Sequence, residues 1–457
     1  MSARIERSWS LLCHVVTLAL LVSIIASARA AAEPTAYVWV EAEDAVAMNA
    51  DFAREGPRSE LLSGGVWIRK SLGKGEAGRA VPPEGFLLRY RLPVPEAGQY
   101  DLWARVGFEW VRAPLEWRIG EGQWTAIGSD VATTNVMELG DWMEVAWLQL
   151  GTPTLPAGPA TLEIRYRGPG SDGRMLMALD CIALMKGTWV PEGRLKPGQQ
   201  YDSELDSRAA GTVFELPTPN SAARTQVKLN GPWQVARYDD LDMDAGAWNP
   251  VQAIPSEQEY PLRWMGINVP SSLWSKPETV FAHRVIYRTR INVPTAHRGR
   301  AFYLHFSGTN WLASIFVNGK LAGTHQGVWI PWDLDVSRYI EPGKVNELAV
   351  AVKGPYYAVD VANDTRGGDL DRQRNRPRNR QDWVFWIEPI HPSTKGDGNG
   401  VDYGIVNPVT LVSVGSAYTE DVFVKPSVAG KQLVADITVR NTAPAERRLQ
   451  ASLRGRV

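Results

Sequence analysis

Short runs of alternating apolar and polar residues, broken by turn residues, constrain this chain more than any other feature. From Tyr37 onward such runs recur, as in GFLLRYRLPV, GQYDLWARVGF and ATLEIRYRG, and no segment shows a convincing helical period. Period-two alternation turns one face of each strand toward a core. Gly, Pro, Asn and Asp separate the runs at spacings typical of sandwiches and jelly rolls. The sequence therefore predicts an all-β fold.

Composition divides the strand runs into separate units. The first set ends at LMALDCIALMKG and predicts a β-jelly-roll over residues 36–187, and a Pro/Gly/Ser/Ala-rich passage then predicts a linker over 188–225. A second series, from VKLNGPWQVARYDD to GIVNPVTLVSV, predicts another jelly-roll over 226–415. Residues 416–457 hold two more strands, fewer than a sandwich of about 100 residues requires. We expect the start of an immunoglobulin-like β-sandwich there.

Residues 1–30 are typical of a signal peptide. Arg4 and Arg7 precede the apolar run LLCHVVTLALLVSIIA, and the A-x-A sequence ARA follows at 28–30. An uncleaved membrane anchor is the alternative, but the short run and its small-residue exit favour cleavage. We therefore expect a secreted or periplasmic protein without a membrane span after cleavage, in which Cys181 is the remaining cysteine.

The balance of charge argues against a polyanion-binding role. The chain carries 49 basic and 50 acidic residues, so no electrostatic surplus would hold nucleic acid. Tryptophan is abundant, with 19 residues against 14 tyrosines. Flat rings stack on the faces of sugars, although large β cores also use tryptophan and most of these rings are expected there. The six arginines from Arg366 to Arg380 predict a solvated loop rather than a site for an acidic ligand.

Three acidic residues form a candidate cation site. Glu41 and Glu43 lie two residues apart in VEAED, so an extended strand places both carboxylates on one face, and Asp180 lies in the apolar run ALDCIAL. Such a pair repels unless it is solvated or shares a cation, and Ca²⁺ prefers hard oxygen ligands. From these residues alone, an exposed polar face is the simpler interpretation.

The segment from about Tyr37 to Gly187 resembles the carbohydrate-binding modules of families 6 and 35. These modules are β-jelly-rolls that open with an E-A-E strand and close with an apolar-Asp-x-Ile strand. The resemblance implies that the three acidic residues named above help to hold a structural Ca²⁺. It also implies an aromatic pair around a sugar, for which Trp142 in GDWMEVAW is the best match. Trp110 is a loop platform or a buried ring, and Ala178 stands where these modules often carry an asparagine.

Residues from about Val227 to Val414 resemble the N-terminal sugar-binding domain of glycoside hydrolase family 2, the β-galactosidase, β-glucuronidase and β-mannosidase group. The matching motifs, in order, are LNGPWQV, VPSSLW, YRTRINVP, FVNGKLAGTHQGVWIPWDLDV, GKVNELAVAV and GIVNPVTLV. The resemblance implies that loops of this domain reach toward the active site of a neighbouring domain. The candidate sugar-binding residues on them are Asn310, Trp311, Asp382, Trp383 and Trp386.

Two details qualify these candidates. Asp382 is expected to hydrogen-bond adjacent sugar hydroxyls while Trp383 stacks, and a loop aspartate beside a buried tryptophan is an equal alternative. Val406-Asn407 occupies the place where the family usually has Arg or Trp-Arg before the closing Pro-Val.

The fourth motif has a structural explanation. Asn318-Gly319 predicts a type I′ hairpin turn, because both central residues of that turn need positive φ. Gly323 and Gly327 are expected to allow close backbone turns. Pro331 suits a sheet edge, Trp332 a core position and Asp333 a cap of the next turn. No chemistry is assigned to this stretch.

Family 2 enzymes carry two catalytic glutamates on a (β/α)₈ barrel and use a retaining mechanism. A barrel needs about 250 residues, and the all-β pattern leaves no room for one here, so we assign no catalytic residue. Asn346-Glu347 resembles the catalytic Asn-Glu but lies in a strand, and His391-Pro392-Ser393 resembles a barrel motif but lies in a Gly/Asp-rich loop.

The expected function is the carbohydrate-binding N-terminal portion of an exported family 2 glycoside hydrolase that acts on oligo- or polysaccharides. A complete secreted glycan-binding protein without chemistry is the alternative, and a structural cell-surface assembly is a third. Strands after Ala417 without a partner sheet would leave backbone groups and apolar faces unpaired, which favours the first.

Overall fold

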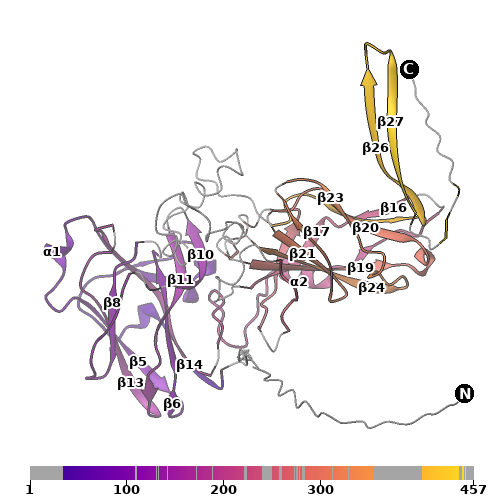
Figure 1. Cartoon of the computed structure of the whole chain (residues 1–457). Coiled ribbons are helices and arrows are strands. Elements are labelled where there is room, and N and C mark those ends of the chain that lie inside the picture. The colour runs from indigo at the N-terminus through magenta and orange to yellow at the C-terminus, as the bar shows by residue number, and fades with distance from the viewer. Residues whose placement is uncertain are drawn as a thin grey trace, which may run out of the picture.

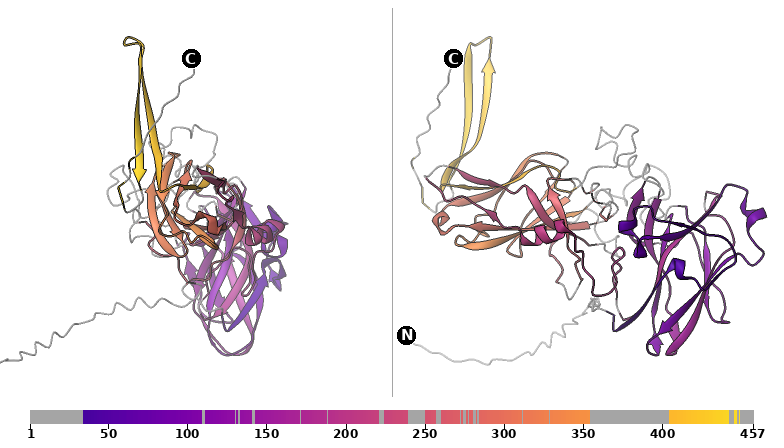
Figure 2. Two further views of the ribbon diagram at one scale, coloured as in Figure 1. Left: turned by 90° about the vertical axis from the view of Figure 1, so that its right-hand side faces the viewer. Right: turned by 180° about the vertical axis from the view of Figure 1, so that it is seen from behind.

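The computed structural model describes residues 34–353 and 404–448, apart from short gaps at 109–110, 130, 132, 141–142, 171, 188, 221–223, 239–249, 257–259, 272, 274–275, 277, 280–281, 283, 311, 328, 442–444 and 447. Almost all regular structure in these residues is strand, which confirms the all-β class (Figures 1 and 2). The predicted signal peptide and the arginine-rich insertion lie outside the described residues. No described helix is long and apolar enough to cross a membrane.

The first domain packs two antiparallel sheets face to face. One sheet has the order β10-β11-β7-β14-β4-β3, with β1 also paired to β14, and the other has the order β2-β5-β13-β8-β9. The strands of the first sheet are β1 (Ala36–Glu41), β3 (Ala53–Glu55), β4 (Trp67–Leu72), β7 (Asp101–Gly107), β10 (Thr134–Gly140), β11 (Met143–Gly151) and β14 (Met175–Lys186). Those of the second are β2 (Ala47–Met48), β5 (Phe86–Val94), β8 (Leu115–Ile119), β9 (Thr125–Ile127) and β13 (Gly158–Tyr166). Short pieces complete the domain: β6 (Gly98–Gln99), β12 (Thr154–Leu155) and α1 (Ala77–Ala80).

Strand β14 is the centre of the first domain. It pairs with β7 on one side and with β4 and then β1 on the other, and all but its last residue are buried. Alternate residues such as Ile182 and Leu184 face the core between the sheets. Cys181 and Ala183 face the other way, into a second apolar cluster with Trp147. A strand covered on both faces reads as a continuous apolar run, as LMALDCIALM does.

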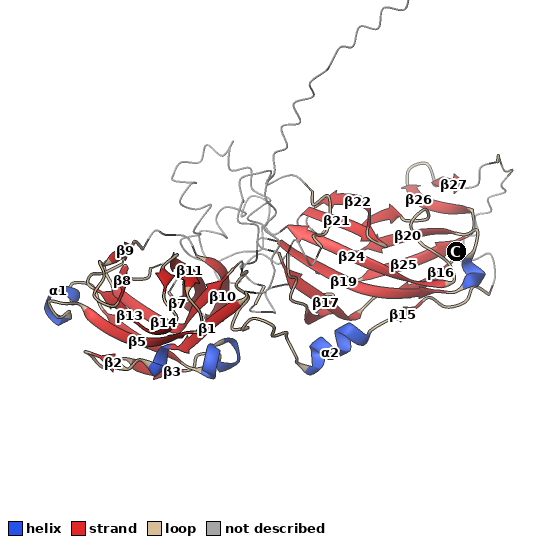
Figure 3. Cartoon of the chain, turned by 90° about the horizontal axis from the view of Figure 1, so that it is seen from below, coloured by secondary structure: helices blue, strands red, loops and turns tan. Residues whose placement is uncertain are grey.

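The predicted linker covers that second face. Trp189 packs edge-to-face on Trp147, with ring centroids 5.0 Å apart, and also contacts Trp39 and Trp103. Further along, α2 (Glu204–Gly211) packs on the second domain, and β15 (Phe214–Glu215) pairs in parallel with β19 (Figure 3). The described residues of 188–225 therefore belong to the two domains and join them through packed contacts, instead of forming an extended tether.

The second domain is also a two-sheet sandwich. Its larger sheet has the order β18-β17-β19-β24-β21-β22, with β15 on β19, and its smaller sheet has the order β16-β25-β20-β23. The larger sheet contains β17 (Gly231–Arg237), β18 (Met265–Val269), β19 (Arg284–Val293), β21 (Leu312–Val317), β22 (Lys320–Gln326) and β24 (Lys344–Lys353). The smaller contains β16 (Thr225–Lys228), β20 (Ala301–Phe306), β23 (Trp332–Asp335) and β25 (Val409–Val414). The rings of Trp233, Tyr287 and Phe306 are fully buried between the sheets.

The hairpin turn predicted at Asn318-Gly319 is confirmed. Both residues have positive φ, 51° and 74°, and they join β21 to β22. The Asn318 side chain also binds strand β24, because its Oδ1 accepts a hydrogen bond from the Glu347 backbone N–H at 2.9 Å. Gly323 is needed for close approach, since a Cβ there would lie 2.5 Å from Leu334 Cδ1.

The end of the motif differs in one detail from its prediction. Trp332 packs against the core and stacks on Phe306, as expected. Asp333, however, is not the cap of the next turn. Its Oδ1 lies 2.7 Å from His305 Nδ1 on the neighbouring strand, and Asp335 instead accepts the hydrogen bond from the Ser337 backbone N–H. Both aspartates face the same side of β23, so alternation alone does not tell which one reaches the turn.

Strands β26 (Ala417–Ser427) and β27 (Gln432–Asn441) form a two-stranded sheet, and no other strand of the described chain pairs with it. It extends from the second domain as a long arm (Figure 1). Tyr418 at its base stacks on Tyr303, but Phe423 and Leu433 farther out are 58% and 60% exposed. These are the two strands predicted after Ala417.

Candidate functional site

Asp180 lies at the bottom of the first domain's acidic cluster, on the buried strand β14. Its Oδ2 is 2.8 Å from Arg105 Nη1, and both side chains are fully buried. The backbone N–H of Ser63 donates to both carboxylate oxygens, at 3.0 and 3.2 Å. Burial raises the pKa of the Asp180 carboxyl to about 6, against the lowering effect of the Arg105 guanidinium. The negative charge of this residue is thus compensated from inside the protein.

Glu41 and Glu43 lie together at the end of β1, where the chain enters the 3-10 helix Ala42–Asp44. Glu41 Oε1 is 3.2 Å from Lys196 Nζ, which comes from the segment after the first domain. The Oε2 atoms of Glu41 and Glu43 are buried and have no hydrogen-bond partner in the described protein. Burial raises the pKa of Glu43, and the charge of Glu41 adds to the rise.

Because Gly64 has no Cβ, the carboxylates of Glu41 and Glu43 can approach its backbone. A Cβ on it would lie 3.1 Å from Glu43 Oε1 and 3.6 Å from Glu41 Cδ, so both carboxylates approach the same stretch of backbone. Two carboxylates that approach the same backbone, each with a buried oxygen without a partner, are a fit for a hard cation. Asp180 is a poor fit, because its oxygens already accept from Arg105 and Ser63. Within the described ranges, no group of three or more His, Cys, Asp or Glu side chains is arranged to hold a metal ion.

Asn310 is buried in the second domain and serves to position its neighbours. It exchanges two backbone hydrogen bonds with Gly404, at 3.0 and 2.7 Å. Its Oδ1 accepts a hydrogen bond from the backbone N–H of Trp329 at 2.7 Å. Trp329 follows β22, has a positive φ of 55° and is 38% exposed. A left-handed non-glycine residue is uncommon and is held only where its surroundings fix it, as Asn310 does here.

Trp329 is an exposed aromatic residue that is not among the predicted sugar-binding residues. It lies in GVWIPW, whose regular spacing was explained entirely by turns and core packing. An aromatic residue two positions before Pro331, after a polar strand, was the available signal. The other predicted sugar-binding residues, Trp110, Trp142, Trp311, Asp382, Trp383 and Trp386, lie outside the described residues.

A family model described as "Glycosyl hydrolase 2 galactose-binding domain-like" matches residues 233–384. The second domain is a glycoside hydrolase family 2 N-terminal domain. A β-galactosidase from Thermoanaerobacter pseudethanolicus is 34% identical over 62 residues, 14% of this chain and 8% of that protein. A β-galactosidase from Thermoanaerobacterium thermosulfurigenes is 24% identical over 148 residues, 32% of this chain and 19% of that protein. The chain thus spans less than a fifth of the length of these relatives.

Among solved structures, a Faecalibacterium prausnitzii β-glucuronidase is 21% identical, with a TM-score of 0.32 over 50% of this chain and 38% of that one. A family 2 member from Bacteroides cellulosilyticus is 19% identical, with a TM-score of 0.30 over 48% of this chain and 25% of that one.

Two asparagines singled out by the sequence, Asn407 and Asn346, have structural roles in the family 2 domain. Asn407 fills the space above Gly308, where a Cβ would lie 2.5 Å from its Nδ2, and its backbone N–H donates to the Gly308 carbonyl. Asn346 is 1% exposed, and its side chain hydrogen-bonds Asn318 and the backbone of Glu341. Asn346-Glu347 lies in strand β24, as the sequence predicts.

Ala178 in the first domain faces an apolar cluster. It is 3% exposed and packs with Trp67, Phe108 and Met137 under the loops at one end of the sandwich. A Cβ on Gly107 would lie 2.7 Å from the Ala178 methyl group, so no room remains here for a longer polar side chain. An apolar cluster therefore surrounds Ala178, the position at which the resemblance to carbohydrate-binding modules would place an asparagine.

Proposed function

We propose that this chain is the carbohydrate-binding portion of an exported family 2 glycoside hydrolase. The observation that carries the proposal is the match of residues 233–384 to the family 2 galactose-binding-like domain model. The described residues of this region belong to a two-sheet sandwich. The relatives that match are named β-galactosidases and a putative β-glucuronidase, so we propose a β-linked oligo- or polysaccharide as the ligand. Hydrolysis of the O-glycosyl bond would require the two carboxylates of a catalytic domain outside this sequence.

The turn at Trp329 supports sugar binding by the family 2 domain. An exposed indole offers a flat apolar face on which the C–H face of a sugar stacks. Because Asn310 fixes the Trp329 backbone, the loop does not have to be ordered when a ligand binds, which lowers the entropic cost of binding. We assign stacking to Trp329 and positioning to Asn310.

We further propose that the first domain is a carbohydrate-binding module with a structural Ca²⁺. Glu41 and Glu43 would hold the ion, because their Oε2 atoms are buried without partners. The bound ion would relieve the repulsion between the two carboxylates and tie the end of β1 to the adjacent backbone. Asp180 would not be a ligand of the ion, because its carboxylate already accepts hydrogen bonds from Arg105 and from the Ser63 backbone. Export by the signal-like residues 1–30 completes the proposal.

Isothermal titration of the chain with methyl β-D-galactopyranoside and methyl β-D-glucuronide tests the sugar-binding proposal. We expect Trp329→Ala to weaken binding about tenfold, which corresponds to about 1.4 kcal/mol. Phe423→Ala is the matched control, because it removes another exposed ring, 58% exposed, on the distant hairpin. Equal Kd values for Trp329→Ala and the unaltered protein would overturn the role of this ring. Absence of saccharide binding by the unaltered protein would overturn the proposed function.

A further inference from the structure

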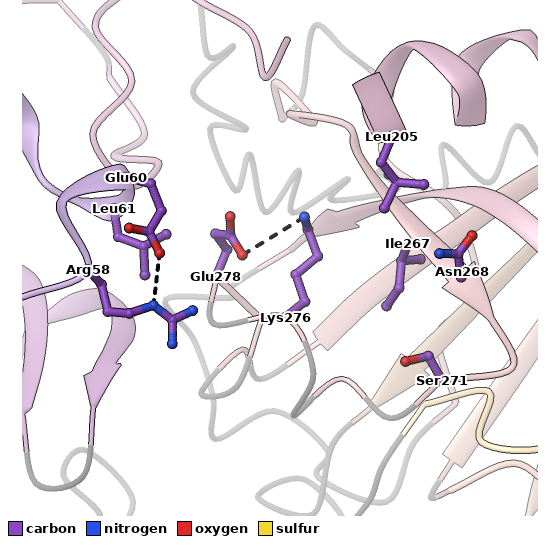
Figure 4. Close-up of a pocket in the computed structure, with 10 residues that line it drawn as sticks. Arg58, Glu60, Leu61, Leu205, Ile267, Asn268, Ser271, Lys276 and Glu278 are labelled. Carbon is purple, nitrogen blue, oxygen red and sulfur yellow. Dashed lines mark hydrogen bonds and ion pairs between the residues drawn. The ribbon is translucent and has the colours of Figure 1, made fainter. Parts of the chain in front are cut away.

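A polar cleft lies between the two domains, with a volume of about 320 Å³ (Figure 4). Arg58 and Glu60 line it from the first domain. Asn268, Lys276 and Glu278 line it from the second, near the end of β18. This volume is at the lower end of the range for small-molecule sites, which suits a ligand of one or two sugar rings.

The two acidic residues of the cleft are held through their backbones by arginines. Arg237 is 2% exposed, and its Nη1 donates to the Glu278 carbonyl at 2.8 Å and to the Val136 carbonyl of the first domain at 2.9 Å. Arg194 Nε donates to the Glu60 carbonyl at 2.8 Å. One buried guanidinium therefore spans the two domains directly behind one wall of the cleft.

The segment that joins the domains adds further fixed contacts. Glu192 accepts hydrogen bonds from Tyr201 Oη at 2.9 Å and from Asn135 Nδ2 at 3.0 Å. Asn135 Oδ1 in turn accepts from the Gly193 backbone N–H, and Trp147 Nε1 donates to the Gly193 carbonyl at 2.8 Å. These buried polar contacts fix the path of the chain from the first domain to the second, so the walls of the cleft keep their spacing.

The charges that line the cleft are balanced within each wall. Arg58 Nε is 2.9 Å from Glu60 Oε1, and Lys276 Nζ is 3.9 Å from Glu278 Oε2 (Figure 4). Each cation already has a carboxylate partner, so the cleft offers no surplus positive charge to an acidic sugar. The carboxylates retain acceptor capacity for hydroxyl groups, since each carboxylate offers about four lone-pair sites.

Apolar side chains complete the lining. Leu61 comes from the first domain, Leu205 from α2 and Ile267 from β18. A sugar ring combines hydroxyl groups at its edge with C–H groups on its faces. Carboxylate, ammonium and amide groups beside short apolar patches match both parts of such a ring.

We propose that this cleft is a binding site for a neutral saccharide, formed jointly by the two domains. Glu60 and Glu278 accept hydrogen bonds from the hydroxyl groups of the ligand, and Arg58 and Lys276 balance the charges of these carboxylates. The proposal rests on the proposed function, because it takes the chain to be a glycan-binding protein. It adds a site remote from Trp329 and a preference for uncharged sugars.

The test is titration of the full chain with the methyl β-glycosides of galactose, glucose and mannose, and with methyl β-D-glucuronide. We expect Glu60→Gln and Glu278→Gln each to weaken binding of a neutral glycoside at least tenfold. Glu341→Gln is the matched control, since Glu341 forms an exposed ion pair with Lys344 away from the cleft. Leu205→Trp is a second, steric variant that fills the cleft without a change of charge.

The outcomes separate this proposal from the proposed function. Unchanged Kd values in Glu60→Gln, Glu278→Gln and Leu205→Trp, with weaker binding in Trp329→Ala, would overturn the cleft and keep the glycan-binding function. Binding of the glucuronide alone would also overturn the cleft. If the unaltered protein binds none of the glycosides, both proposals fail.

Discussion

One buried polar cluster in each domain can be compared, because the first is incompletely hydrogen-bonded and the second is complete. The first domain buries the charges of Arg105 and Asp180 and leaves carboxylate oxygens of Glu41 and Glu43 without partners. The second domain buries a neutral histidine. His297 Nε2 lies 2.9 Å from the Pro217 carbonyl, so it carries the proton and donates.

His297 Nδ1 accepts a hydrogen bond from Ser413 Oγ at 2.8 Å, and Ser413 Oγ in turn accepts one from Arg300 Nε. The ring is 0% exposed, and its burial lowers the pKa of the imidazole. Both ring nitrogens are satisfied by protein groups, and the contact ties Pro217, at the end of the joining segment, to β25. The hydrogen bonds of the His297 ring are therefore complete, whereas the buried carboxylate oxygens of Glu41 and Glu43 would be satisfied by a cation or a proton. Incomplete satisfaction of buried polar groups is what distinguishes the candidate site from the structural network.

Of the effects predicted here, the loss of stability on removal of Arg105 should be the largest. Arg105→Met leaves the Asp180 carboxylate buried without its cation, so the free energy of unfolding of the first domain should fall by about 3–5 kcal/mol. Urea unfolding followed by tryptophan fluorescence measures the loss. Adding Asp180→Asn to Arg105→Met should recover much of it, because the buried charge is then absent. A loss below about 1 kcal/mol would show that the pair is hydrated and not buried as described.

A smaller effect is expected in the neutral cluster. His297→Ala removes a donor and an acceptor and leaves the Pro217 carbonyl and Ser413 hydroxyl unsatisfied, so the second domain should lose about 1–3 kcal/mol of stability. His305→Ala is the control, since His305 lies on the neighbouring strand with its side chain 39% exposed. Equal losses in the two variants would remove the distinction between a buried network and a surface pair.

The proposed Ca²⁺ site predicts a smaller effect on stability, which depends on the concentration of free Ca²⁺. Addition of Ca²⁺ in place of EDTA should raise the melting temperature of the first domain, and Glu43→Gln should abolish this response and stabilise the metal-free protein. The gain is set by the ratio of free Ca²⁺ to its Kd, and a hundredfold excess adds about 2.7 kcal/mol. Arg105→Met should bind Ca²⁺ more tightly, because it frees Asp180 to become a third carboxylate. A melting temperature that does not respond to Ca²⁺ or EDTA would argue against the site.

The sequence predicts the strands well because alternation is a local property. Phe86–Val94 alternates between buried and less buried residues as its sequence alternates, and Asn318-Gly319 forms the turn that its own backbone preferences require. The pairing of Arg105 with Asp180 is not local, since 75 residues separate them. The sequence around either residue therefore does not predict which residue it pairs with. The packing of the described residues of 188–225 could not be predicted from the sequence for a similar reason. Composition records the Pro, Gly and Ser residues, but the segment is held by Trp189 on the first domain and by α2, which begins with a capping box at Ser203, on the second.

The last prediction uses pH to separate the two domains. In the first domain, burial raises the pKa of Glu43 and moves that of Asp180 to about 6. Their favourable contribution is fully present below the ordinary carboxyl pKa, and it is lost as the pH rises through the folded-state values, to about 6 for Asp180. In the second domain, burial lowers the pKa of His297, so its contribution is present above the ordinary histidine pKa of about 6.5 and is lost as the pH falls below it.

Between about pH 4 and 7 the two unfolding transitions should therefore shift in opposite directions in the presence of EDTA, by an amount that we expect to be the smallest of these effects. Differential scanning calorimetry at several pH values measures both transitions in one chain. His297→Ala should flatten only the second domain's profile and Glu43→Gln only the first. Parallel shifts of the two transitions would mean that the buried groups named here do not control the pH response. Because each domain then supplies the control for the other, the direction of each shift identifies the cluster that causes it.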